Sequence, residues 1–131
     1  MGTINMRIIW LFGLLTLVGF STACSSGKHP AAKSVEVFLQ ALVARDEARF
    51  VARTCQEFES DALLEFDSFS MVKTRLEGLD CQAVKEDGDN ATVACKGKIV
   101  ATYGLEDQTF ELEERAYQVT KRGGEWLVCG S

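Results

Sequence analysis

Apolar residues between positions 35 and 43 recur with the period of an α-helix. Such a stripe packs one helix face against a core while the intervening polar residues face solvent. The stripe consists of Val35, Phe38, Leu39, Leu42 and Val43. Pro30 suits a first helical turn, where its missing N–H has no partner to lose. The pattern predicts a helix over residues 30–44.

Two more helices are predicted between Gly27 and Gly78, a stretch that contains no other glycine. Asp46 can cap a short helix that runs through Phe50 and Val51 towards Cys55, because its carboxylate accepts from free backbone N–H groups. A third helix is predicted over about 56–72, where aromatic and alanine residues recur every three or four positions. These residues are Phe58, Ala62, Phe66 and Phe69.

After Lys73 the apolar period changes from 3.6 to two, which is typical of half-buried strands. Strands are predicted over 76–85, 91–103, 108–121 and 125–129, separated by turn-forming residues at 87–90, 104–107 and 122–124. Helices followed by an antiparallel meander indicate an α+β fold, with the helices packed on one face of a curved four-stranded sheet.

Two strands carry further information in their alternation. The second predicted strand places one set of residues on a single face, namely Val93, Cys95, Ile99, Ala101 and Tyr103. In the third, the apolar phase is even at Phe110 and Leu112 but odd at Tyr117 and Val119. A β-bulge at Glu113-Glu114 would restore one buried face.

The first 24 residues have the composition of a secretory signal peptide. Arg7 precedes a 13-residue apolar run, Ile8 to Phe20, and small residues then lead to Cys24. That run is shorter than the roughly 20 residues a spanning helix needs. Small residues followed by cysteine resemble the bacterial lipobox, which implies that Cys24 is lipidated and becomes the mature N-terminus.

This interpretation divides the chain into a signal peptide (1–23), a tether (24–29) and one domain (30–131). It predicts a lipid-anchored protein on the extracytoplasmic side of the cell membrane or outer membrane. The whole chain has 14 basic and 19 acidic residues, and Arg7 is the only charge before Cys24. The mature part is therefore acidic, which argues against nucleic-acid binding and against electrostatic docking on anionic lipid.

Five cysteines occur, at positions 24, 55, 81, 95 and 129. If Cys24 takes lipid, four remain, and these allow three disulfide connectivities. Export would place them in an oxidising compartment, where disulfides persist. Their wide spacing, without a Cys-x-x-Cys pair, argues against zinc.

Two cysteine contexts and the order of elements resemble a known family. Thr54-Cys55-Gln56 and the segment Gly124-Glu125-Trp126-Leu127-Val128-Cys129-Gly130 are similar to small bacterial lipoproteins of the NTF2-like (cystatin-like α+β) superfamily, in particular the DUF4878-type group. The resemblance covers about residues 30–131. It implies a curved sheet around a long helix, forming a cone with a pocket, and it implies no defined activity.

The resemblance also implies that Cys55 bonds to Cys129, which leaves Cys81 for Cys95. If Lys85 pairs with Ala91, Cys81 lies directly opposite Cys95 on the same sheet face. A two-residue turn would instead place Cys81 opposite Lys96 and send the two thiols to different faces. The bond therefore predicts an odd-length loop between the two strands.

No residue matches a transferable catalytic motif, and no cofactor or metal site is predicted. His29 is expected to be an exposed linker side chain. Glu65 and Asp67 lie in the third predicted helix near aromatic residues, and both are expected to be solvated. The acidic residues at 106, 107, 111, 113 and 114 lack the spacing of a calcium loop and are expected to form a solvated hairpin.

Six aromatic residues are candidates for lining the cone: Phe66, Phe69, Tyr103, Phe110, Tyr117 and Trp126. Core packing is the competing interpretation, because aromatic side chains supply much of the burial in small domains. The expected function is a non-catalytic binding or scaffolding domain for an envelope protein or a small apolar ligand. The alternative is an enzyme of isomerase or dehydratase type that uses a pocket carboxylate.

Overall fold

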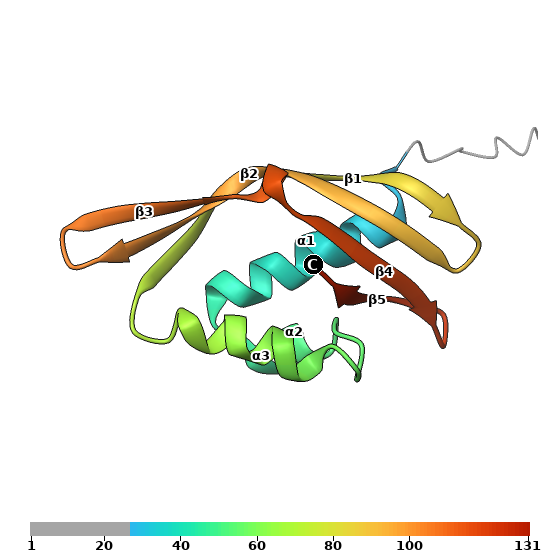
Figure 1. The fold of residues 1–131 in the computed structure, drawn as a ribbon, viewed down its shortest axis with the longest axis horizontal. Helices are drawn as coiled ribbons and strands as arrows, with labels where there is room; N and C mark the ends of the chain where they lie inside the picture. The colour runs from blue at the N-terminus through green and yellow to red at the C-terminus, as the bar shows by residue number, and fades with distance from the viewer. Residues whose placement is uncertain (1–26) are drawn as a thin grey trace, which may run out of the picture.

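A computed structural model describes residues 27–131 of the chain, so the predicted signal peptide and Cys24 lie outside the described residues. The elements are α1 (Pro30–Ala44), α2 (Glu47–Val51), α3 (Glu59–Ser68), β1 (Lys73–Asp87), β2 (Asn90–Tyr103), β3 (Glu106–Glu111), the 3₁₀ turn η1 (Leu112–Glu114), β4 (Ala116–Arg122) and β5 (Glu125–Gly130). The helices lie together on one side of a bent antiparallel sheet (Figure 1). The α+β class is therefore confirmed.

The sheet has five strands rather than the four predicted. Its order is β1-β2-β4-β5, and β3 pairs with the other half of β2. The predicted third strand is divided by η1 at the place where its apolar phase changes. A β-bulge was expected at this point. That expectation is wrong, because the 3₁₀ turn η1 is what shifts the apolar side chains from even to odd positions. It keeps Leu112 buried while the chain moves from pairing with residues 98–103 to pairing with residues 90–94.

Helices α1 and α2 begin as the sequence predicts, but α3 starts later and ends earlier than the predicted range of about 56–72. Helix α1 spans the predicted residues, and Asp46 caps α2 by accepting from the backbone N–H of Arg49 at 3.1 Å. Helix α3 starts only at Glu59, because Thr54 and Cys55 are held against β5 and residues 56–58 form a turn. There the N–H of Cys55 donates to the carbonyl of Val128 at 2.8 Å.

The β1–β2 hairpin brings Cys81 directly opposite Cys95, but not through an odd-length loop. Asp87 pairs with Asn90 around a two-residue turn, and Lys85 pairs with Thr92 rather than with Ala91. A register shift between Ala83 and Lys85 adds one residue to β1. This bulge at Val84 changes the register by one and returns the two cysteines to the same face. The predicted loop parity and the Lys85–Ala91 pair are therefore wrong.

A second irregularity bends the sheet where β2 passes from β4 to β3. The register shifts between Glu77 and Asp80, and Gly97 lies opposite with φ +100°. A Cβ atom on Gly97 would be 2.5 Å from the carbonyl oxygen of Glu77 and 2.6 Å from Gly78. Only glycine permits this approach of two backbones. A register shift and a close backbone approach interrupt the sheet at this glycine pair, and the sheet is bent in Figure 1, so the predicted curved cone is not an exact description.

The beginning of the domain is fixed to its body rather than free. His29 caps α1 by accepting from the N–H of Ala31 at 3.1 Å, and its ring packs edge-on to Trp126 at 5.3 Å. Lys28 Nζ contacts Asp80 Oδ1 at 2.7 Å and also pairs with Glu36. His29 was expected to be an exposed linker side chain. That expectation is wrong, because His29 contacts both Ala31 and Trp126.

Within the described range, 27–131, no helix is long and apolar enough to cross a membrane.

Candidate functional site

The six aromatic residues predicted to line one pocket lie in four separate places. Phe66 and Tyr117 are buried in the core beside Phe38 and Phe50. Phe69 and Phe110 form a second pair, with ring centroids 5.6 Å apart. Tyr103 is 40% exposed near the tip of the β2–β3 hairpin. Trp126 is half-buried against His29 at the other end of the domain. The single aromatic pocket is therefore wrong.

Aromatic packing fills the space between α1, α3 and β4. The rings of Phe38 and Phe50 stack at 4.4 Å, Phe50 meets Phe66 at 5.1 Å, and Phe38 meets Tyr117 edge-on at 6.3 Å. All four side chains are at most 3% exposed. Rings at these separations leave no space for another molecule between them. This cluster of Phe38, Phe50, Phe66 and Tyr117, called the aromatic core below, is a packed interior.

One polar atom in the aromatic core is unsatisfied. The hydroxyl of Tyr117 is buried and has no hydrogen-bond partner among residues 27–131. Burial raises the pKa of this hydroxyl, because the ionised form would be poorly solvated. Two charged groups act on this hydroxyl: Arg115 favours its ionised form and Glu65 disfavours it, and the two form an ion pair with 2.5 Å between Nη1 and Oε1. The sequence analysis did not identify Arg115 as the partner of Glu65. The only hint in the sequence was its position directly after the phase change in the predicted third strand.

We expect Tyr117→Phe to leave stability unchanged or raise it. Removing an unsatisfied buried hydroxyl while keeping the ring eliminates a desolvation penalty of about 1–3 kcal/mol without making a cavity. Urea denaturation, followed by tryptophan fluorescence, measures the change in unfolding free energy. Tyr103→Phe is the matched control, since its side chain is exposed and the change should be neutral. A loss above about 1 kcal/mol in Tyr117→Phe would show that the hydroxyl has a stabilising partner.

The two acids singled out in the sequence have different surroundings. Glu65 is half-buried and already occupied by Arg115, whereas Asp67 is exposed on the outer face of α3. Phe66, between them, points into the aromatic core. The expectation that both acids are solvated is correct for Asp67 and wrong for Glu65, whose pairing partner comes from 50 residues further along the chain.

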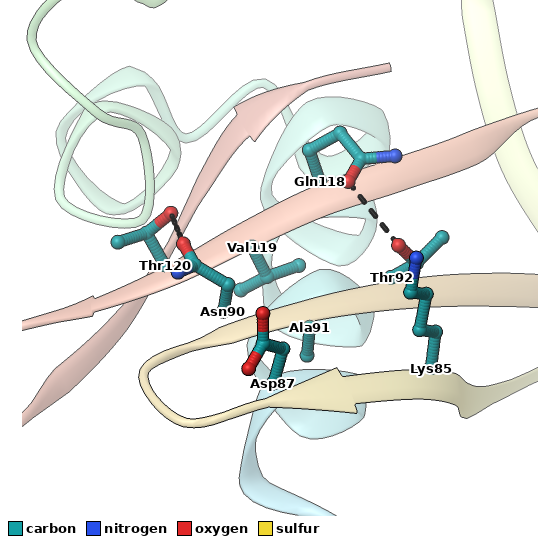
Figure 2. A pocket seen from close by; sticks show the side chains of 8 residues that line it. All are labelled: Lys85, Asp87, Asn90, Ala91, Thr92, Gln118, Val119 and Thr120. Carbon is teal, nitrogen blue, oxygen red and sulfur yellow. Dashed lines mark hydrogen bonds between the residues drawn. The ribbon is translucent and has the colours of Figure 1, made fainter.

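A polar surface pocket of about 260 Å³ lies over β1, β2 and β4. Its lining residues are Lys85, Asp87, Asn90, Ala91, Thr92, Gln118, Val119 and Thr120. Figure 2 shows that four of its side chains are paired across β2 and β4: Thr92 with Gln118 at 3.2 Å and Thr120 with Asn90 at 3.0 Å. Groups that satisfy one another in this way stabilise the strand pairing.

A second pocket, of about 230 Å³, lies between the beginning of α1 and the β4–β5 turn. Its lining residues are Pro30, Lys33, Ser34, Val37, Arg53, Gly124, Glu125 and Trp126. Ser34 is buried and its hydroxyl donates to the carbonyl oxygen of Trp126 at 2.5 Å, so it fastens α1 to β5. Of the six aromatic residues discussed above, Trp126 alone lines either of these two pockets.

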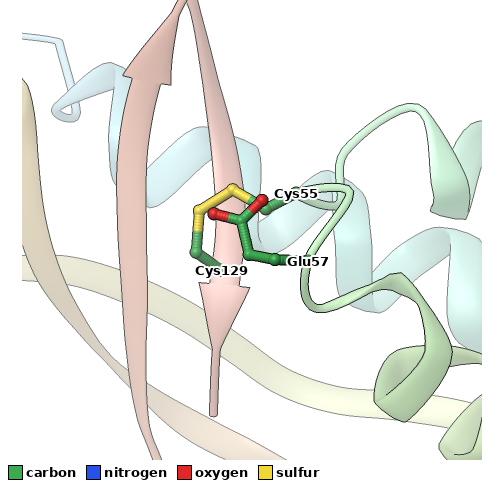
Figure 3. A group of neighbouring side chains, drawn as sticks. All are labelled: Cys55, Glu57 and Cys129. Carbon is green, nitrogen blue, oxygen red and sulfur yellow. A yellow bond between two sulfur atoms is a disulfide. The ribbon is translucent and has the colours of Figure 1, made fainter.

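Cys55, Glu57 and Cys129 bring potential metal-binding atoms within 4.8 Å of one another. The two sulfur atoms are bonded to each other, with Cα atoms 4.9 Å apart (Figure 3). A disulfide has no thiolate to offer a metal. Glu57 in turn pairs with Arg122 through both of its carboxylate oxygens. The cluster is therefore a covalent junction between the segment before α3 and β5.

The other two cysteines form the second pair. Cys81 and Cys95 face each other across β1 and β2, with Cα atoms 4.0 Å apart and a disulfide between them. The structure thus places the four cysteines in the two pairs that the family resemblance implied.

The Arg122 side chain lowers the pKa of Glu57 from 4.5 to about 2 by hydrogen bonding. A lowered carboxyl pKa gives stability that is present above pH 4.5 and is lost as the pH falls towards 2. We expect Arg122→Gln to return the Glu57 midpoint towards 4.5 in a carbon-13 NMR titration. Arg49→Gln, on α2, is the control that should leave the midpoint low. An equally low midpoint in Arg122→Gln would mean that Arg122 is not the cause.

No family model and no curated protein matches this sequence. Among solved structures, the chain is similar to the solution structure of a SEC-C motif containing protein from Rhodopseudomonas palustris, with a TM-score of 0.51 and 18% identity over 78% of this chain and 79% of that one. It is also similar to a protein of unknown function with a cystatin-like fold from Nostoc punctiforme, with a TM-score of 0.45 and 13% identity over 76% of this chain and 83% of that one. At these identities the likeness concerns the fold alone.

Proposed function

We propose that this protein is a membrane-anchored extracytoplasmic lipoprotein whose NTF2-like domain binds or scaffolds an envelope partner and performs no catalysis. The observation that carries the proposal is the aromatic core. The space in which a cone-shaped domain would hold a small ligand is filled by Phe38, Phe50, Phe66 and Tyr117. A domain with a packed interior interacts with other molecules through its surface.

The cysteines support the location. Cys24 follows an apolar run and small residues, and the remaining four cysteines form two pairs. Disulfides persist in exported proteins and are rare in reducing compartments. Cys24 is four residues before Lys28, so the chain can carry a lipid-bearing Cys24 no further than about 14 Å, from Cα to Cα, from Lys28. The end of the domain that carries His29 would then face the membrane.

Labelling with a radioactive fatty acid in a bacterial host tests the anchor. We expect the unaltered chain to take up label and to sediment with membranes. Cys24→Ser should abolish both, because the thioether that carries the lipid cannot form, while the matched variant Ser26→Ala should behave like the unaltered chain. Equal labelling and sedimentation of Cys24→Ser would refute lipid attachment at this residue.

One observation favours the second candidate function, an isomerase or dehydratase. Glu65 lies near the buried hydroxyl of Tyr117, and a carboxylate beside a desolvated hydroxyl is a pairing that acid–base catalysts use. In this structure Glu65 is engaged by Arg115, and it lines neither of the two surface pockets described above. A carbon-13 titration decides between the two functions: a midpoint near neutral pH for the Glu65 carboxyl would favour the enzyme, and an acidic midpoint would favour the binding domain.

A further inference from the structure

Sheet edges expose backbone N–H and C=O groups that can pair with another strand, and proteins usually protect them. The edge of β5 is covered by the segment before α3. The N–H of Val128 donates to the carbonyl of Arg53, and the N–H of Cys55 donates to the carbonyl of Val128, both at 2.8 Å. Because this segment is also tied to β5 through Cys55 and Cys129, that edge is closed.

The edge of β1 is also protected. Two register shifts, near Gly78 and at Val84, interrupt its regular pattern. Between them, the outward N–H of Cys81 donates to Glu36 Oε1 at 3.1 Å, so a side chain from α1 occupies the place of a partner strand. Lys28 covers the same part of the edge, because it forms ion pairs with Glu36 and Asp80.

The edge of β3 has none of these devices. Its register with β2 runs without a shift from the pair Lys98–Glu111 to the pair Tyr103–Glu106. Its other side has no strand partner within residues 27–131. The β2–β3 hairpin projects from the body of the domain at the end opposite to the beginning of α1 (Figure 1). Six residues of regular, accessible strand are therefore available for pairing.

The side chains around this edge determine which strand it accepts. Glu106 and Glu111 on β3, and Glu113 and Glu114 on η1, are exposed, and no ion pair joins them to another described residue. Asp107 differs, because its carboxylate accepts hydrogen bonds from Thr102 Oγ1 at 2.6 Å and from Arg75 Nη2 at 3.4 Å. Like charges would repel a second copy of the same edge, whereas a lysine- or arginine-bearing strand would be attracted. Leu105 at the tip is fully exposed and adds apolar contact area.

We propose that the free edge of β3 docks an extended, basic segment of a partner protein, which adds a sixth strand to the sheet. This inference rests on the proposed function and names its interaction surface. Backbone hydrogen bonds would supply affinity. Glu106 and Glu111 are five residues apart on a regular strand and so lie on opposite faces, where each would attract a basic side chain near one end of the incoming strand. If Cys24 anchors the chain, the hairpin points away from the membrane, where a partner can reach it (Figure 1).

A peptide titration tests the docking. The mature, anchored protein in phosphatidylcholine nanodiscs is titrated with a fluorescent, blocked seven-residue peptide of alternating lysine and valine at physiological ionic strength, and the anisotropy is recorded. We expect saturable binding. The same peptide with N-methyl groups at alternate positions keeps its charge but cannot pair along the edge, so its affinity should fall at least about tenfold.

Variants of the protein test the location. Glu106→Lys combined with Glu111→Lys should weaken binding at least about tenfold, whereas Glu47→Lys combined with Glu59→Lys, the same change of charge on the helices, should leave it within about twofold. Equal binding of the N-methylated peptide, equal effects of the two double variants, or no binding at all would overturn the inference. So would a stable dimer that excludes the peptide. Lipidation of Cys24 is measured independently, so failure of the peptide to bind leaves the proposed anchored function standing.

Discussion

Gly97→Ala is expected to lower the free energy of unfolding by about 4 kcal/mol, the largest effect of any single substitution that we predict. Gly97 has φ +100°, a backbone conformation that side chains other than glycine rarely adopt. The added methyl group would also meet backbone atoms, with the Glu77 carbonyl oxygen at 2.5 Å and Gly78 at 2.6 Å. Backbone atoms of a paired strand cannot move aside as a flexible side chain can, so the bend between the two halves of the sheet must distort.

Urea denaturation of the mature protein measures this loss. Gly104→Ala is the matched control, because Gly104 also has a positive φ, +64°, but its Cβ would meet nothing within 4 Å. The control should cost only the conformational penalty, about 1 kcal/mol. Equal losses in the two variants would show that the approach of β1 and β2 at Gly97 is not a tight contact.

Removing the Cys55–Cys129 bond is expected to destabilise the domain more than removing the Cys81–Cys95 bond. The first bond spans 74 residues and the second spans 14. In the chain-entropy description, the longer loop is worth about 4 kcal/mol and the shorter about 3 kcal/mol. The first bond also fixes the segment that closes the edge of β5, while Cys81 and Cys95 lie on strands already paired by backbone hydrogen bonds.

The double variants Cys55→Ala/Cys129→Ala and Cys81→Ala/Cys95→Ala, compared by thermal and urea denaturation, test this order. Non-reducing peptide mapping of the unaltered protein supplies the connectivity. Free thiols at all four positions, a peptide joining Cys55 to Cys81, or a larger loss in the Cys81/Cys95 variant would contradict the account.

Local patterns predicted the elements whose signals are contained in short windows. The apolar stripe from Val35 to Val43 identified α1 over its whole length, and Asp46 identified the beginning of α2. The alternation in β2 correctly placed Val93, Cys95, Ile99 and Ala101 on the buried face. Tyr103 continued the pattern in sequence but not in burial, because the hairpin extends beyond the helices that cover the rest of that face (Figure 1).

The wrong predictions about the strands concern the places where the pairing register or the apolar phase shifts by one residue. The parity argument at the β1–β2 turn gave the right opposition of Cys81 and Cys95 but the wrong loop, because one bulged residue at Val84 has the same effect on parity as one more loop residue. Similarly, the phase change near Glu113 is compatible with a bulge or with a 3₁₀ turn, and alternation alone does not distinguish them. Gly78 and Gly97 were unremarkable until the pairing placed them opposite each other.

The candidate site was the least predictable part. The sequence does not tell whether the six aromatic residues line a cavity or fill a core. Residues in either place are apolar and alternate with polar residues along the chain. Their distribution depends on long-range packing, such as Phe110 against Phe69 and Trp126 against His29. The Glu65–Arg115 pair, 50 residues apart in sequence, is of the same kind.

Intact mass spectrometry of the mature protein, extracted from bacterial membranes and analysed before and after reduction, tests the central claim most directly. The account predicts a chain that begins at Cys24, carries acyl chains on that residue, and gains the mass of four hydrogen atoms on reduction, which corresponds to the two disulfides. A soluble protein that begins at another residue, or an unlipidated protein whose four other cysteines are free before reduction, would contradict it.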